Sequence, residues 1–310
     1  MGLSVSQVLA PKTIVKAVQQ LNLPGTTLQR LFGWHFSGTN KLQQSGRNFA
    51  YDVVQNTRQI ATARVPGQAS SRQRPQQIQA STGTFPRSAE TISLFDEDLL
   101  NRRAIGGPSD ELDSRGETYV TRQEAYLAQR FANLIEFQTA AMLRGSYAYQ
   151  EEGDELRHGF TGNGVQISFS VPTGNTSQLD MLGEGDILNA DWASAGTDIP
   201  QHLHQINAAM VRLTGLGLAH VALTSVGWQY LVNNTKVQAQ GGSANVVFDS
   251  LQRIGAGEFS VVLRAIPWVT FHVIDYGLDI WNGSSHTFAK LIDDTHAAFF
   301  PEGLQCCPDH

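Results

Sequence analysis

Histidines and a carboxylate that could bind a metal ion or transfer protons occur at two places in the second half of the chain. His202 and His204 lie two positions apart in a segment with helical spacing, so they face different sides of a helix, which is poor geometry for one metal ion. His272 and Asp275 lie in and after an apolar, strand-like segment, but no nucleophile pairs with them. We therefore expect structural roles, surface or partly buried, for these residues and no catalytic residue among them.

Other motifs that often carry chemistry are incomplete in this chain. The stretch from Gly215 to Gly217 resembles a dinucleotide-binding loop, but it follows a predicted helix, precedes a strand and lacks the third glycine, so we interpret Gly215 as a helix end. No GxxxxGK[ST] or GxSxG motif occurs. The acidic run at 151–155 is typical of a solvated turn, and adjacent Cys306 and Cys307 form neither an unstrained disulfide nor a zinc site. The residues predict no cofactor, no metal site and no enzyme.

The distribution of charge is more informative than its total. The 310 residues are 41% hydrophobic and carry a net charge of -6, which is typical of a soluble globular protein. Residues 41–90 hold seven basic residues against two acids, and no acid occurs from 53 to 89. The segment 63–82, ARVPGQASSRQRPQQIQAST, has too few apolar residues to fold alone. We expect it to dock on an acidic surface of another copy; nucleic-acid binding is the competing hypothesis, but interleaved aromatic residues are missing.

The longest helical signal lies at 121–145. Thr121 and Glu124 have the spacing of a capping box, and Gly145 is placed as a C-terminal stop. An apolar stripe follows helical spacing between them and predicts a packing face that includes Phe131, Leu134 and Ile135. Glu136 lies off that stripe, so we expect it to tolerate alanine.

The remaining pattern mixes strands and helices, which predicts an α+β fold. Residues 43–91 read as a two-stranded excursion, with extended runs at 48–54 and 59–65. Further strands are predicted at 146–149, at 164–171, in AHVALTS, in WVTFHVIDYG and as a closing pair at 296–307. Helices are predicted from Asp198, as N-cap, to Gly215, in VGWQYLVNN and at 244–254.

Several stretches, in this order, carry a resemblance to a known family: TFPRSAETISLFDEDLL, RQEAYLAQRFANLIEFQTAAMLRG, YAYQ followed by GVQISFSVP, ADWASAGTDIPQHLHQI, HVALTSVGWQYLVNN and FFPEGLQCCP. Together they resemble the major capsid proteins of tailed bacteriophages, in particular the capsid protein E family of the phage lambda major head protein. The resemblance covers most of the chain.

The resemblance implies the Hong Kong 97-type capsid fold and an icosahedral head shell around double-stranded DNA. It implies an N-terminal arm at 1–42, an extended loop at 43–91, a peripheral domain at 92–190 with a spine helix at 122–144, an axial domain at 191–271 and a return to the peripheral domain at 272–310. The extended loop would then contact a neighbouring subunit through Arg64, Arg72 and Arg74. Expected partners are other copies in pentamers and hexamers, scaffold, portal and cement proteins, and packaged DNA without specificity; no membrane is expected.

The resemblance also implies a place in the virion, after assembly in the host cytoplasm. Some relatives cross-link their shells through a loop lysine, but this chain has no lysine between Lys41 and Lys236, which favours a separate cement protein. Two alternatives stay open: an encapsulin-like shell protein, which would share the fold, and a soluble α/β hydrolase, which would need a pocket with perturbed titratable groups.

Overall fold

The computed structural model describes residues 27–31, 48–54, 78–84, 92, 110–152, 155–160, 165–169, 171, 173–175, 179–242, 248–253, 258–281 and 285–301. Within these ranges helices combine with four separate β-sheets, so the fold is α+β as predicted. Two hydrophobic cores organise the molecule: one beneath the largest sheet and one around the end of a long helix.

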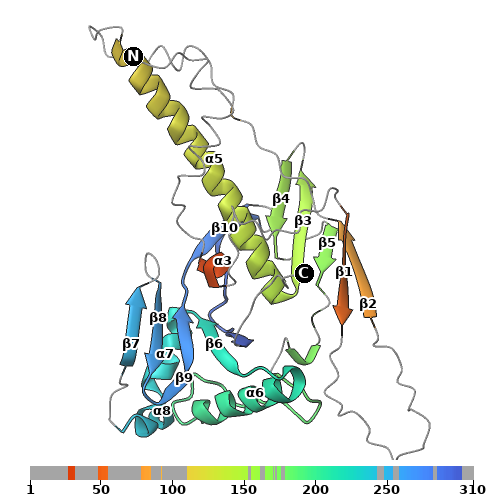
Figure 1. The fold of residues 1–310 in the computed structure, drawn as a ribbon, viewed down its shortest axis with the longest axis vertical. Coiled ribbons are helices and arrows are strands. Elements are labelled where there is room, and N and C mark those ends of the chain that lie inside the picture. Colours follow the sequence, from red (N-terminus) through yellow and green to blue (C-terminus); the bar gives the residue numbers. More distant parts are fainter. Residues whose placement is uncertain are drawn as a thin grey trace, which may run out of the picture.

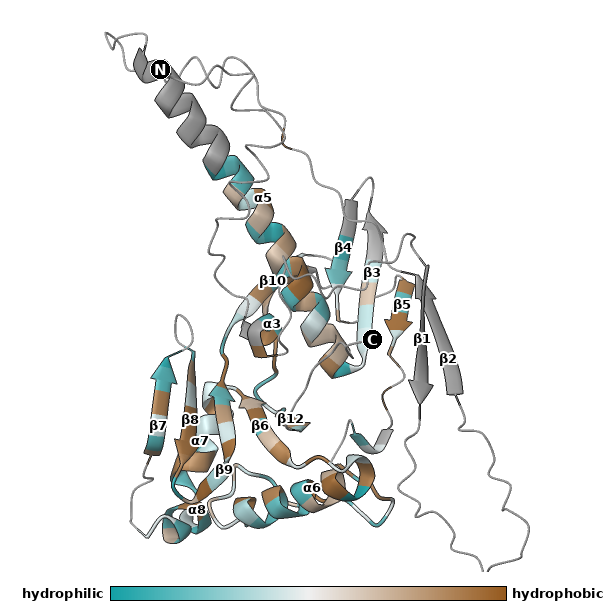
Figure 2. Ribbon diagram, in the orientation of Figure 1, coloured by the Kyte–Doolittle hydropathy of each residue, from teal (hydrophilic) through white to brown (hydrophobic). Residues whose placement is uncertain are grey.

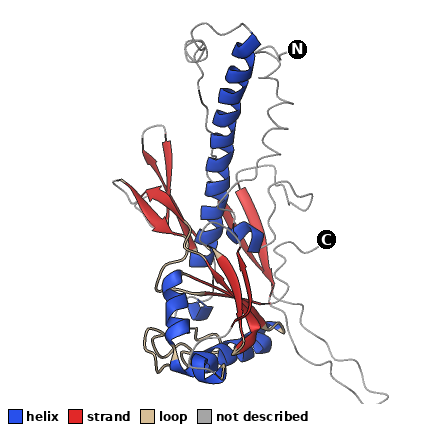
Figure 3. Cartoon of the chain, turned by 90° about the vertical axis from the view of Figure 1, so that its left-hand side faces the viewer, coloured by secondary structure: helices blue, strands red, loops and turns tan. Residues whose placement is uncertain are grey.

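The long helix, α5, spans Asp110–Arg144. Its 35 residues extend about 50 Å, and its first turns rise beyond the sheets (Figures 1 and 3). The expected start at 122 is therefore wrong, and Thr121 and Glu124 lie inside the helix instead of capping it. The sequence DELD at its start is rich in the acidic residues that helix N-termini favour. The predicted stop is confirmed, since Gly145 has a φ of 79°, in the left-handed region that glycine adopts without strain.

A three-stranded antiparallel sheet follows α5 directly. It has the order β4-β3-β5, with β3 at Ser146–Glu152, β4 at Glu155–Gly159 and β5 at Val165–Ser168. The acidic run was expected to be a turn, but Glu152 pairs with Glu155, so most of the run belongs to the two strands. A 3₁₀ turn, η1 at Thr173–Asn175, then leads towards the second half of the chain.

A two-stranded ribbon confirms part of the predicted excursion. β1 (Asn48–Val54) and β2 (Ile78–Thr84) are antiparallel, in a register that runs from Asn48 opposite Thr84 to Val54 opposite Ile78. The extended run expected at 59–65 lies outside the described residues, as do Arg64, Arg72 and Arg74.

The largest sheet has five strands in the order β12-β6-β9-β8-β7, in which only the β6–β9 pair is parallel. Its strands are β6 (Leu218–Leu223), β7 (Phe248–Arg253), β8 (Phe259–Leu263), β9 (Ile266–Val273) and β12 (Ala298–Pro301). The helix expected at 244–254 is thus wrong, because residues 248–253 pair with β8 as an edge strand. Of the closing pair expected at 296–307, the described part is β12, which pairs with β6; residues 302–307 lie outside the described ranges.

Three helices cover one face of this sheet (Figure 3). They are α6 (Ile199–Thr214), α7 (Ser225–Asn233) and α8 (Thr235–Gln240), of which the first two were predicted. Both predicted ends of α6 are confirmed: the Asp198 carboxylate accepts a hydrogen bond from Gln201 N at 3.1 Å, and Gly215 has a φ of 85°. Along β8 and the second half of β6, every second residue points into the core that these strands share with the helices, and these residues are hydrophobic (brown in Figure 2).

The second core joins distant parts of the chain around the last turns of α5. It receives α3 (Thr27–Leu31), β3, Ile274 just after β9, β12 and the segment after the hairpin of β10 (Gly277–Trp281) and β11 (His286–Lys290). The buried face of α5 carries Ala132, Glu136, Phe137, Ala140 and Ala141. Phe131, Leu134 and Ile135 are only partly buried, so the most buried face differs from the predicted apolar stripe.

Candidate functional site: the junction between the two cores

The side chain of Glu136 joins α5 to α3, 108 residues earlier in the chain. Its Oε1 accepts a hydrogen bond from the backbone N–H of Leu28 at 2.6 Å, and its Oε2 accepts one from Gln29 N at 3.2 Å. Gln29 Nε2 in turn donates to the carbonyl of Ala132 at 3.1 Å. The first N–H groups of a helix have no partner within the helix, so Glu136 satisfies two donors that would otherwise be buried alone.

Glu136 is fully buried, which corrects the expectation that it lies off the packing face and tolerates alanine. Burial raises the pKa of this carboxyl to about 7, although the hydrogen bonds from Leu28 and Gln29 act in the opposite direction. Glu258, just before β8, adds a smaller increase through charge repulsion. A second contact lies beside it, where the Tyr276 hydroxyl donates to Asn133 Oδ1 at 3.1 Å.

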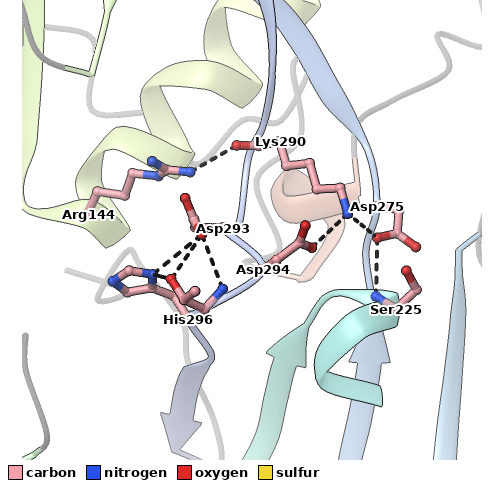
Figure 4. A network of polar contacts seen from close by, with 8 residues as sticks. Arg144, Ser225, Asp275, Lys290, Asp293, Asp294 and His296 are labelled. Atoms are coloured by element: carbon pink, nitrogen blue, oxygen red, sulfur yellow. Dashed lines mark hydrogen bonds and ion pairs between the residues drawn. The ribbon is translucent and has the colours of Figure 1, made fainter. Parts of the chain in front are cut away.

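Arg144 fastens the C-terminal end of α5 to the segment after β11 (Figure 4). Its Nη2 donates to the carbonyl of Lys290 at 2.9 Å, and its Nε donates to the carbonyl of Leu291 at 3.3 Å. The guanidinium carbon also lies 3.9 Å from the centre of the Phe160 ring, within the range of a cation–π contact. Arg144 thus connects α5, the end of β4 and the returning chain.

Lys290 makes the corresponding connection to the largest sheet (Figure 4). Its Nζ lies 2.7 Å from Asp294 Oδ1 and 3.1 Å from Asp275 Oδ1. Asp275 Oδ1 also accepts from Ser225 N at 3.1 Å, at the start of α7. Burial raises the pKa of Asp275, but the hydrogen bonds from Ser225 and the ammonium of Lys290 outweigh it and hold that pKa below its ordinary value. The contact with Asp294 is the main reason that the pKa of Lys290 is raised.

His272 lies between two polar side chains on the sheet, those of Ser260 and His220. Its Nδ1 is 2.7 Å from Ser260 Oγ on β8, and its Nε2 is 3.2 Å from Nδ1 of His220 on β6. A serine beside a histidine is part of the geometry of nucleophilic catalysis. Burial, aided by the charge of His220, lowers the pKa of His272 to about 4, which makes it a weak base at neutral pH. The structure thus places a serine beside His272, which the sequence did not indicate, although the lowered pKa makes His272 a poor base for it.

His202 and His204, the two histidines of α6, lie on different sides of that helix, one buried and one exposed. His202 is buried and accepts a hydrogen bond from Trp192 Nε1 on its Nδ1 at 3.2 Å. His204 is exposed and contacts Trp268, with ring centres 5.0 Å apart and ring planes tilted by 33°. Over the described ranges, no three or more His, Cys, Asp or Glu side chains gather to hold a metal ion, and no helix has the length and apolar character to cross a membrane.

Sequence reasoning considered Asp275 but missed Glu136, Arg144 and Lys290. A glutamate within a strongly apolar helical segment was the available signal for Glu136, because a charged group on a buried face needs a partner. Lys290 is one of only five lysines; its partner Asp294 lies four residues on in the sequence, but nothing local indicates Asp275.

The geometry of the junction is that of a framework that fixes chain segments to one another. Most of its contacts link elements that are far apart in sequence, and the charged groups bind other groups of the same chain. No curated protein matches the chain. The family model for phage major capsid protein E matches residues 11–307, which is nearly the whole chain. The chain therefore belongs to the phage major capsid protein E family, whose members are structural proteins of the bacteriophage head.

Proposed function

We propose that this chain is the shell subunit that assembles with other copies of itself into the icosahedral head around phage double-stranded DNA. The observation that carries the proposal is the family match over residues 11–307. The described architecture supports it: a long helix with a small sheet at one end, a separate α/β unit and a polar framework that joins them.

The arrangement is compatible with the Hong Kong 97-type capsid fold. In this proposal, 1–42 is the N-terminal arm, 43–91 the extended loop, 92–190 the peripheral domain, 191–271 the axial domain and 272–310 the return to the peripheral domain. The spine helix is α5, which begins at Asp110 instead of 122. The core beneath the five-stranded sheet includes Leu179, which precedes the proposed start of the axial domain at 191. The core around α5 includes Leu291 and Phe300, from the segment that we propose returns to the peripheral domain.

The extended loop would tie neighbouring subunits together. Arg64, Arg72 and Arg74 follow β1 and precede β2, in a stretch without acids. Arginine binds carboxylates through two parallel hydrogen bonds and loses less on desolvation than lysine does, so it suits an interface between subunits. Phe131, Leu134 and Ile135 are partly buried in the single chain, and we propose that this face of α5 completes its packing in the shell.

The subunit would act without catalysis and without a cofactor. Its partners would be its own copies in pentamers and hexamers, together with scaffold, portal and cement proteins, and assembly would take place in the host cytoplasm. Closed rings of identical subunits use head-to-tail contacts, which a loop reaching over a neighbour provides.

Imaging tests this proposal directly. The full chain, expressed with its neighbouring head genes, should give closed shells of uniform diameter in negative-stain micrographs. Fields without any closed particle, from preparations in which the chain is soluble and folded, would contradict it.

A further inference from the structure

Exposed hydrophobic side chains gather at two places on the α/β unit that is built on the five-stranded sheet. Among the described residues, nine large hydrophobic side chains are exposed, and five of them lie in this unit. They form two groups: Phe248 and Leu251 on β7, and Val211, Leu213 and Leu216 at the end of α6. In Figure 1, β7 lies at the left edge of the unit, and α6 extends away from it towards the right.

On β7, the core of the unit reaches the edge of the sheet and ends uncovered. Phe248 lies opposite Leu263 in the register with β8, and Leu251 lies opposite Val261. Both β8 residues are fully buried in the core, so the two β7 residues lie on the core side of the sheet. Leu251 is nevertheless 64% exposed, and Phe248 is 45% exposed although its ring stacks on that of Trp228. A single chain thus leaves this end of its core in contact with water.

The two edge strands of this sheet differ in how they are covered. β12 contributes Phe300 to the second core, whereas all six residues of β7 are exposed. The register between β7 and β8 also shifts between Phe248 and Ser250, which interrupts the ladder and disfavours the addition of a further strand at this edge. A partner would therefore pack against the side chains of β7.

The end of α6 presents the second exposed hydrophobic group. Val211 is 38% exposed, Leu213 43% and Leu216 46%, whereas Met210, one residue before Val211, is buried. Gly215 ends the helix with a φ of 85°, so the chain turns here and Leu216 lies beyond the last turn. Three aliphatic side chains within six residues at an exposed helix end are typical of a contact surface.

The charges around the two groups are opposite in sign. Beside Leu251, two bases accompany one acid: Arg253, Arg264 and Asp249. Beside the end of α6, one base accompanies three acids: Arg212, Asp180, Glu184 and Asp186. The ion pair of Glu184 with Arg212, at 2.7 Å, holds this acidic loop against the helix end. Complementary charge of this kind favours one orientation of two contacting surfaces.

We propose that these two surfaces bind each other between copies of the chain, with the β7 group of one subunit against the α6 group of the next. The two surfaces differ and lie on opposite sides of the unit, so the contact is head-to-tail and repeats around a closed ring. The occupant of each surface is a second copy, because the same chain carries the complementary charge and hydrophobic groups. This inference rests on the proposed function, since it names the surfaces through which the subunits of a pentamer or hexamer meet.

Substitutions that place a repelling charge on either surface test the contact. Leu251→Glu faces the acidic group and Leu216→Lys faces the basic one, so each should lower the yield of shells at least about tenfold. Both positions are exposed, so the circular dichroism spectrum of the single chain should not change. Leu251→Lys and Leu216→Glu, with the attracting charge at the same positions, should lose less. Gln205→Lys, at an exposed position of α6 outside the group, is the control and should keep the wild-type yield.

Cross-linking within assembled shells tests which surfaces meet. Leu251→Cys and Leu216→Cys are combined in one chain with Cys306→Ser and Cys307→Ser, and the shells are treated with a short bis-maleimide reagent. A denaturing gel should show a series of covalently joined chains that extends to about five or six, because each copy is linked to both neighbours in its ring. Shells with Leu251→Cys alone, in the same serine background, should yield single chains.

The outcomes separate this inference from the proposed function. Shells that form normally but show no joined chains, or a series that stops at dimers, would overturn the head-to-tail contact and leave the shell function standing. The same holds if Leu251→Glu and Leu216→Lys assemble as well as the wild type does. A folded wild-type chain that never forms shells would contradict the proposed function, and this inference with it.

Discussion

Nε2 of His272 lies 3.2 Å from Nδ1 of His220, and this contact joins β9 to β6 across the one parallel pair of the largest sheet. One proton can sit between these two ring nitrogens, so protonation of both rings would place two N–H donors face to face. The pair is therefore stable only while at least one ring is neutral, and His272, which is 8% exposed, is the more deeply buried of the two.

This relationship predicts that acid weakens the sheet through His272. Its pKa is 6.5 in the unfolded chain and about 4 in the fold, so the stabilisation is complete above pH 6.5 and is lost as pH falls towards about 4. The pKa of Glu136 is raised in the fold, so its contribution to the stability of the fold increases as the pH falls through the same range. In the whole protein the effects of His272 and Glu136 therefore oppose each other. The effect of His272 is isolated by the difference in the free energy of unfolding between His272→Gln and the wild type. In urea unfolding, this difference should shift by about 2 kcal/mol in favour of the variant when the pH is lowered from 7 to 5.

The control for this experiment is His204→Gln, which changes an exposed histidine. It should leave the pH dependence of unfolding as in the wild type. If His272→Gln and His204→Gln gave the same profile, the buried pair would not be a source of acid sensitivity.

Phe137 is predicted to be a main stabilising residue of the core around α5. It is 2% exposed, and its ring centre lies 4.6 Å from that of Phe160 and 5.8 Å from that of Tyr147. Phe137→Ala should reduce the free energy of unfolding by about 3–5 kcal/mol, because it leaves a cavity among aromatic rings. Met142→Ala, on the same helix at 43% exposure, should cost less than about 1 kcal/mol in the same denaturation experiment. Equal costs would mean that the buried face of α5 is assigned wrongly.

Arg144 is predicted to stabilise the junction through the shape of its side chain as well as through its charge. Arg144→Lys keeps the charge but cannot reach both carbonyl groups and cover Phe160 at the same time, so it should cost about 1–2 kcal/mol, given its partial exposure. Arg212→Lys is the matched control, because its ion pair with Glu184 is exposed on both sides and should contribute little. Thermal unfolding that ranks the two variants equally would contradict the role given to Arg144.

The elements that the sequence predicted correctly are those with local signals. The ends of α6 follow from Asp198 and Gly215, and the end of α5 follows from Gly145, because cap geometry depends on a few neighbouring residues. Residues 244–254 were expected to form a helix, but 248–253 pair with β8 as a strand, and such pairing depends on a neighbouring strand more than on local sequence.

The contacts of the junction depend on residues far apart in the chain, which limits what one sequence can predict. The burial of Glu136 is completed by α3, 108 residues away, on a helix face whose neighbouring Ala132 and Ala140 are also buried. Of the two partners of Lys290, Asp294 lies four residues away, whereas Asp275, which follows β9, is 15 residues away and has no local signal. The family, by contrast, was recognised from the order of several short stretches and is confirmed by the match over residues 11–307.

The extended loop is predicted to act between subunits and not within one. Replacement of Arg64, Arg72 and Arg74 by glutamate should leave the circular dichroism spectrum and the melting temperature of the single chain unchanged, while shell yield falls sharply. Each arginine that loses a desolvated carboxylate partner removes about 1.5–3 kcal/mol per subunit. Replacement of the same three residues by lysine, which keeps the charge, should give an intermediate yield. A normal yield of shells from the glutamate variant would contradict the role of these residues, while leaving the shell itself unaffected.

Sedimentation velocity of the purified full-length chain, produced together with its head-gene neighbours, tests whether the chain forms a shell. We expect a fast, homogeneous boundary from particles many times heavier than the 33.9 kDa chain, with pentamers or hexamers as the smaller species. A folded chain that sediments only as a monomer or dimer under these conditions, at every protein concentration tried, would mean that it is not a shell subunit.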